Sequence, residues 1–244
     1  MAVDQNAHFK ETLAEIHRRW GSDALRPLAA LSSSSIRIPT GYPSLDRLLG
    51  GGIPCGRVIE LIGAPTSGMT TLAMKIIAEG QMQGRIGILV DLAGVFDPGY
   101  GVRCGVRLDG LLLARPSNPN SALDILRIVA EEGGAGLAVL DSLANVLSMP
   151  NGERVLDAGL RRLAPALRRS GGTVLALNPS KASPALTQHA ALRLAFENRG
   201  WLEEGRDISG CRARVTALKS RGSRPNQHVD LDITLDGEIL GEAA

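Results

Sequence analysis

The sequence predicts an α/β domain with a mostly parallel central sheet flanked by helices and an antiparallel β-extension at its C-terminal end. Through the middle of the chain, short apolar runs alternate with helical segments, which is typical of parallel strands wound into one sheet. Beyond Leu192, apolar and polar residues alternate with period two and polar turns separate the segments, which indicates antiparallel strands.

The composition limits the class of protein. The 244 residues are 44% hydrophobic and 21% charged, so we expect one α/β domain with a small appendage. The net charge of +2 is too small to argue for nucleic-acid binding by itself, and aromatic residues (3%) offer few platforms for single-stranded bases. No segment resembles a signal peptide or membrane span, and the three cysteines lack metal-site spacing, so we expect a cytoplasmic protein without a metal centre.

Residues 1–35 are predicted to form an arm and linker ahead of a core domain at 36–244. Apolar residues at helical spacing predict an amphipathic helix over 8–20, and an extended piece follows at 23–28. Helix and strand either pack on their own domain or dock on the sheet edge of another subunit, and a serine-rich linker behind them favours docking. The predicted interface residues of this arm are Phe9, Leu13, Ile16 and Leu25.

The core is predicted element by element from its apolar runs. Buried strands are expected at 58–62, 86–90, 111–113, 137–140 and 173–177. The helices that separate them are expected at 69–81, 120–132 and 152–169.

A degenerate phosphate-binding loop lies between the first of these strands and its helix. The segment 63–71 fits G-x-x-x-x-G-K-[ST] except that Met69 occupies the lysine position. In such a loop, glycines turn backbone N–H groups toward phosphate oxygens, the lysine reaches the β- and γ-phosphates, and a threonine hydroxyl binds magnesium. The candidate residues here are Gly63, Thr66, Ser67, Gly68, Met69, Thr70 and Thr71.

A carboxylate ends a second apolar strand, at Asp141. In proteins with a phosphate-binding loop, an aspartate in this position holds the magnesium shell. The alternative is an ordinary strand-end or helix-capping aspartate, but the loop at 63–71 favours the functional interpretation.

From Phe9 to Leu240 the chain resembles bacterial RecA recombinase in the order of its motifs. The segment 38–57, which runs IPTGYPSLDRLLGGGIPCGR, resembles the entry into the RecA core. The segment 89–91 followed by Asp97 and Tyr100 resembles the strand and adenine-contacting turn of that family, and the arm resembles its oligomerisation arm. The resemblance also implies that Lys219 and Arg221 reach the ATP of a neighbouring subunit.

The departures from the family carry the functional hypothesis. Besides Met69, Ala93 stands where the family has the glutamate that activates water, and Pro179 stands where it has the glutamine that senses the γ-phosphate. The segments matching the DNA-binding loops, 147–153 and 178–190, are short. A charge about 3 Å from a phosphate oxygen contributes about 5 kcal/mol at an effective dielectric near 20. A general base contributes roughly 10²–10⁴ in rate.

These losses predict a pseudo-ATPase that requires no cofactor. Weak binding of ATP with magnesium stays open, because the backbone cradle and Thr70 need no lysine. The competing possibility is that another cation fills in, either Lys75 or Lys219 of a neighbouring subunit.

Four arginines form a stripe on the predicted helix 152–169. They are either a phosphate-contacting face for single-stranded DNA or the solvated face of an ordinary helix, with Pro165 as a candidate kink. These residues are Arg161, Arg162, Arg168 and Arg169.

The sub-family most similar to the chain is ImuA, the RecA-like accessory of the bacterial mutasome. This resemblance implies an adaptor in SOS-induced, error-prone lesion bypass. The implied partners are RecA, an ImuB-type polymerase-like protein and an error-prone DnaE-type polymerase, with further copies of the chain as another candidate. Two alternatives are an ATP-dependent recombinase with a rearranged site and a nucleotide-sensing signalling module.

Overall fold

The computed structural model divides the chain into two compact units, Met1–Ile36 and Arg37–Ala244. The structure describes residues 2–21, 36–133, 136–179, 183–220 and 226–235, with side chains from residue 10 onward. Within the first unit lies α1 (Ala2–Trp20), which starts six residues before the predicted helix. The predicted strand at 23–28, with Leu25, lies outside the described residues. Among the described helices, none has the length and apolar character needed to cross a membrane.

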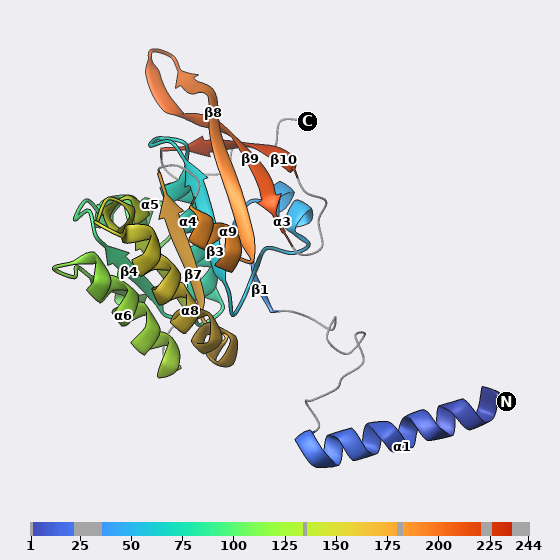
Figure 1. The fold of residues 1–244 in the computed structure, drawn as a ribbon. Coiled ribbons are helices and arrows are strands. Elements are labelled where there is room, and N and C mark those ends of the chain that lie inside the picture. Colours follow the sequence, from blue (N-terminus) through green and yellow to red (C-terminus); the bar gives the residue numbers. More distant parts are fainter. Residues whose placement is uncertain (1, 22–35, 134–135, 180–182, 221–225, 236–244) are drawn as a thin grey trace. The chain divides into compact units, whose positions relative to one another are not determined.

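The second unit contains an eight-stranded sheet in the order β10-β9-β8-β3-β7-β6-β4-β5, and Figure 1 labels most of these strands. Neighbouring strands from β8 to β5 pair in parallel, whereas β9 and β10 run antiparallel to their neighbours. The parallel strands are β3 (Val58–Gly63), β4 (Gly87–Asp91), β5 (Leu111–Ala114), β6 (Leu137–Asp141), β7 (Thr173–Asn178) and β8 (Leu192–Glu204). The extension is formed by β8 with β9 (Asp207–Lys219) and β10 (Gln227–Thr234). The predicted fold class is therefore confirmed.

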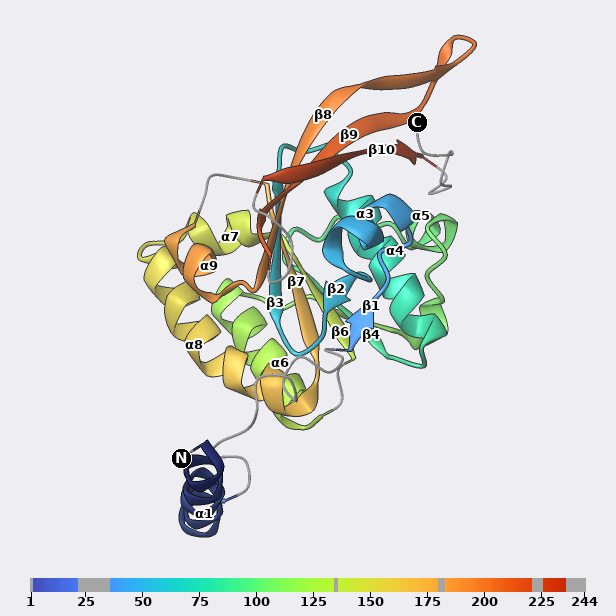
Figure 2. The same ribbon diagram turned by 90° about the vertical axis from the view of Figure 1, so that its right-hand side faces the viewer.

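Helices cover both faces of this sheet (Figure 2). They are α3 (Pro43–Leu49), α4 (Met69–Met82), α5 (Pro98–Arg103), η1 (Leu108–Gly110), α6 (Pro119–Glu131), α7 (Leu143–Leu147), α8 (Gly152–Ser170) and α9 (Pro184–His189). A small antiparallel pair, β1 (Arg37–Ile38) and β2 (Ile53–Pro54), precedes β3. Helix α8 continues on both sides of Pro165, the residue named above as a candidate kink.

Two separate apolar cores follow from the alternation of side chains along the buried strands. Leu89, Val139 and Leu177 face one core together with α4 and the extension. Val90, Leu140 and Ala176 face the other core, which α6 and α8 cover. Because both faces are covered, the central strands read in sequence as continuous apolar runs.

Candidate nucleotide-type pocket

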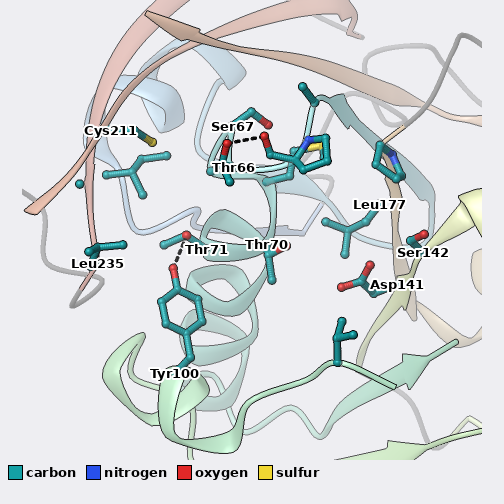
Figure 3. A pocket seen from close by; sticks show the side chains of 18 of the residues that line it. Thr66, Ser67, Thr70, Thr71, Tyr100, Asp141, Ser142, Leu177, Cys211 and Leu235 are labelled. Atoms are coloured by element: carbon teal, nitrogen blue, oxygen red, sulfur yellow. Dashed lines mark hydrogen bonds between the residues drawn. The ribbon is translucent and has the colours of Figure 1, made fainter. Parts of the chain in front are cut away.

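A pocket of about 480 Å³ opens at the carboxyl ends of the central parallel strands (Figure 3). Its lining comes from the loop after β3, the loop after β4, the ends of β6 and β7, and the extension. Ligands of wound α/β sheets bind at this end, because the loops there diverge and leave a crevice.

The loop between β3 and α4 depends on two glycines. A Cβ on Gly63 would lie 2.7 Å from the carbonyl oxygen of Phe196 and 2.9 Å from Oγ of Ser67, so only glycine allows this approach of β8. Gly68 has φ +92° and precedes the first turn of α4, a left-handed conformation that glycine adopts without strain. The segment 63–71 thus forms a tight loop between β3 and α4, with Thr66 also at positive φ, and its binding of phosphate stays a prediction.

Met69 is part of the apolar core as well as of the pocket wall. Its side chain is 6% exposed and packs in the same core as Ile233 and Phe196. Thr70 is exposed at the pocket, while the hydroxyl of Ser67 is buried and has no hydrogen-bond partner among the described residues. The residue at the lysine position of the motif is therefore a buried side chain of the core. It lies two residues after Ser67, whose buried hydroxyl is unpaired among the described residues.

Tyr100 and Thr71 close one side of the pocket through a hydrogen bond between their hydroxyl groups. Burial raises the pKa of Tyr100 to about 12, so its hydroxyl stays protonated at neutral pH. Asp97 does not line the pocket, although the resemblance grouped it with Tyr100. Its carboxylate instead caps α5 by accepting from the N–H of Gly99 at 2.8 Å.

Two carboxylates end the neighbouring strands β4 and β6 and have opposite environments. Asp91 accepts hydrogen bonds from the N–H groups of Gly94, Val95 and Phe96 and from Nε of Arg115. Burial alone would raise the pKa of Asp91, but these hydrogen bonds outweigh it and lower the pKa. The pKa of Asp141 is raised, first by burial and then by the charge of Asp91. Asp141 lines the pocket, as predicted for a magnesium-shell residue, whereas Asp91 holds the following loop.

The two other sequence departures also lie at the pocket. Ala93 and Pro179 both line it, and these are the positions where the resemblance implies a water-activating glutamate and a phosphate-sensing glutamine. Directly before Pro179, Asn178 donates from Nδ2 to Oε1 of Glu60 at 2.8 Å. Glu60 is fully buried and also pairs with Arg193, which makes a polar link between β3, β7 and β8 beneath the loop.

Several lining residues were not predicted as site residues. They come from the antiparallel extension: Trp201, Gly210, Cys211, Ile233, Thr234 and Leu235. Their alternating pattern predicted strands. The position of β10 beside the loop after β3 depends on the pairing of β10 with β9 and of β9 with β8, which brings together residues far apart in sequence. No local signal in the sequence identifies that pairing.

The lysines proposed as substitutes for the missing charge lie elsewhere. Lys75 does not line the pocket and lies beside Gly41 and Glu79. Nζ of Lys219 donates to the carbonyl oxygen of Thr187 at 2.9 Å, at the end of α9 in its own chain. Its reach to a neighbouring subunit stays a prediction, and Arg221 lies outside the described residues.

The arginine stripe is exposed along α8. Arg161 forms an ion pair of 3.0 Å with Asp157, and the other three side chains are exposed on the same helix. The structure thus places the four arginines on one element, and their contact with DNA stays a prediction. On the extension, Arg212 and Arg214 form bidentate pairs with Asp232 and Asp230, so an acidic side chain offsets each of these two charges.

Comparisons with known proteins agree with this fold. Residues 7–178 match the RecA N-terminal domain family. Protein RecA of Chloroflexus aurantiacus is 33% identical over 95% of this chain and 74% of its own length. Protein RecA of Geobacter sulfurreducens is 30% identical over 98% of this chain and 81% of its own length. A solved structure of the RadB recombinase superposes with a TM-score of 0.65 at 22% identity, over 82% of this chain and 97% of that one.

Proposed function

The chain belongs to the RecA family, and we propose that it is an accessory member of the ImuA kind that does not turn over ATP. In this role it is an adaptor or regulator in SOS-induced, error-prone lesion bypass. It contacts RecA, and it contacts an ImuB-type polymerase-like protein or a DnaE-type polymerase. The carrying observation is that no lysine, arginine or histidine lines the pocket within the described part of the chain.

The pocket side chains fit a hydrolysable ATP–magnesium complex poorly. The glycine cradle, Thr70 and Asp141 supply the backbone and metal-side groups such a complex uses. The cation that would offset the β- and γ-phosphate charges is absent from the lining of 63–71, and Ala93 has no proton acceptor. Each loss removes several kcal/mol of transition-state stabilisation, so assembly through subunit surfaces is the activity that the chain retains.

The arm supports an assembly role. On α1, Leu13 and Ile16 are half-buried one turn apart, and the residue Trp20 farther along is 64% exposed. An apolar stripe on a helix is suited to docking on another subunit. We place the contact with RecA on this stripe.

The test is a titration of the chain into RecA that is hydrolysing ATP on single-stranded DNA, with both proteins from the same organism. A subunit that docks on a filament without supplying a working ATP interface limits its growth. RecA activity should therefore fall at substoichiometric amounts of the chain. Unchanged activity at equimolar protein would contradict the proposal.

A matched pair of variants assigns the effect to the arm. Leu13→Glu with Ile16→Glu places charge on the apolar stripe and should abolish inhibition. Ala14→Glu adds the same side chain at an exposed position of the same helix and should leave inhibition intact. Equal inhibition by the double variant and by Ala14→Glu would show that the apolar stripe of the arm is not part of the interface with RecA.

The 33% sequence identity to a RecA protein over 95% of the chain favours one second candidate, an ATP-dependent recombinase with a rearranged site. That function requires phosphate release stimulated by single-stranded DNA and abolished by Asp141→Asn. Its absence, together with inhibition of RecA, separates the two candidates.

A further inference from the structure

The charge of the pocket is opposite to what a polyphosphate needs. Asp141 is the one formally charged side chain among the described lining residues, and it is an acid. The backbone N–H groups at the start of α4 offer only a partial positive charge. Transfer of several phosphate charges into a site that contains a carboxylate and no counter-cation is costly.

The remaining lining is rich in apolar groups from the extension. Trp201 of β8 pairs directly with Cys211 of β9, and Cys211 pairs with Ile233 of β10. Directly paired residues of antiparallel strands project on the same face, so these three side chains form one apolar row. All three line the pocket, and Ile233 lies against Gly68 of the loop at 63–71.

The row ends in an available aromatic ring. Trp201 is 51% exposed as a residue although it lines the pocket, so its indole offers stacking surface to an occupant. Leu177 and Val95 extend the apolar lining on the parallel-sheet side. The volume of about 480 Å³ is in the range of small-molecule sites.

One buried polar group lacks a partner within this apolar setting. Ser67, a residue only 2% exposed, lines the pocket, and its hydroxyl makes no hydrogen bond to any part of the chain that the structure describes. Buried hydroxyls are normally paired, since an unpaired one carries its full desolvation cost. Rotation of the Ser67 side chain toward the pocket would let a neutral ligand pair with this hydroxyl without bringing charge next to Asp141.

We propose that this pocket binds an uncharged, hydroxyl-bearing aromatic ligand of nucleoside size, stacked on Trp201 and hydrogen-bonded to Ser67, and that it discriminates against polyphosphates. The inference rests on the proposed loss of ATP turnover and names the ligand class of the same site. The phosphate-binding loop is then reused as one wall of an apolar pocket.

The experiment uses the full chain with Trp20→Phe, so that Trp201 is the one remaining tryptophan. Its fluorescence is titrated with adenosine, adenosine monophosphate and ATP, each with and without magnesium. Adenosine should saturate the signal below about 1 mM and bind about tenfold or more tightly than ATP, with the monophosphate between them. Tighter binding of ATP, or no saturable adenosine signal, would overturn the inference.

Calorimetric titrations of adenosine into variants of the natural sequence test the two contacts. Trp201→Ala should weaken adenosine by about tenfold or more through lost stacking. Ile208→Ala, on the same hairpin and equally 51% exposed but outside the pocket, should leave affinity unchanged. Ser67→Ala should weaken adenosine about fivefold or more while leaving the protein no less stable, because it removes an unpaired buried hydroxyl.

Equal affinities of the Trp201 and Ile208 variants would overturn the stacking site, and unchanged affinity in Ser67→Ala would overturn the hydrogen bond. Inhibition of RecA is measured separately. Inhibition without adenosine binding therefore defeats this inference alone, whereas adenosine binding without inhibition defeats the adaptor proposal alone.

Discussion

Ile233 of β10 lies directly against Gly68 of the phosphate-binding loop, so that a Cβ added at Gly68 would overlap Cδ1 of the isoleucine. The extension therefore packs against the loop at Gly68. The left-handed φ of +92° at this residue would also strain any side chain placed there. Gly68→Ala should lower the free energy of unfolding by about 1–3 kcal/mol, measured by urea denaturation.

The matched control for this substitution is Gly84→Ala. Gly84 has a similar φ of +77°, but nothing lies within 4 Å of the added Cβ. Its cost is backbone strain alone, about 1–2 kcal/mol. Only Gly68→Ala should also alter binding at the pocket, and an equal effect of both variants on binding would contradict the contact with Ile233.

The sequence predicts the elements well because their signals are local. The strand ending at Asp141 and the helix beginning at Met69 both occur where their periodicity places them. The sequence does not predict that Met69 and Ile233 belong to the same core, because this depends on the pairing of β10 with β9 in the sheet. Likewise, nothing local in the sequence indicates that Glu60 pairs with Arg193, which is 133 residues away.

The buried pair of Glu60 and Arg193 gives a second prediction. Their side chains are 0% and 11% exposed, and Glu60 also accepts from Asn178. Glu60→Gln keeps the shape but leaves the guanidinium of Arg193 buried without a counter-charge. It should lower the free energy of unfolding by about 3–5 kcal/mol.

An exposed pair on the same strand β8 is the control. Arg199 and Glu197 are 44% and 62% exposed, so water screens their interaction. Glu197→Gln should change stability by less than about 1 kcal/mol. Both substitutions are measured by denaturation under the same conditions. Comparable decreases in the free energy of unfolding would show that burial does not determine how much the pair of Glu60 and Arg193 contributes to stability.

Asp91 and Asp141 should respond to pH with opposite signs. A lowered folded-state pKa means that Asp91 stabilises the fold above its ordinary value of 3.8, and that this is lost as pH falls through the lower folded value. A raised pKa means that ionised Asp141 destabilises the fold at neutral pH, and that this is relieved as pH falls through the raised value.

Asp91→Asn should therefore destabilise the protein at pH 7, and Asp141→Asn should stabilise it. Both differences from the unaltered protein should shrink toward pH 3. Urea midpoints measured at intervals between pH 3 and pH 7 check this. Two shifts of the same sign at pH 7 would contradict the assigned environments.

Restoring the missing groups should require more than one substitution. Met69→Lys supplies the phosphate-side cation, but the position of Ala93 still lacks a base. The single variant should gain affinity for ATP without gaining phosphate release. Met69→Lys with Ala93→Glu should raise release about tenfold or more above the single variant, a fraction of the 10²–10⁴ typical of a general base. Full activity in the single variant would show that Ala93 is not the position of the lost base.

The proposed loss of ATP turnover is tested most directly by phosphate release from ATP by the chain itself, in the presence of magnesium and single-stranded DNA. We predict release indistinguishable from that of the Asp141→Asn variant, with and without DNA. Release that DNA stimulates and that Asp141→Asn abolishes would contradict the account and identify the chain as a working ATPase.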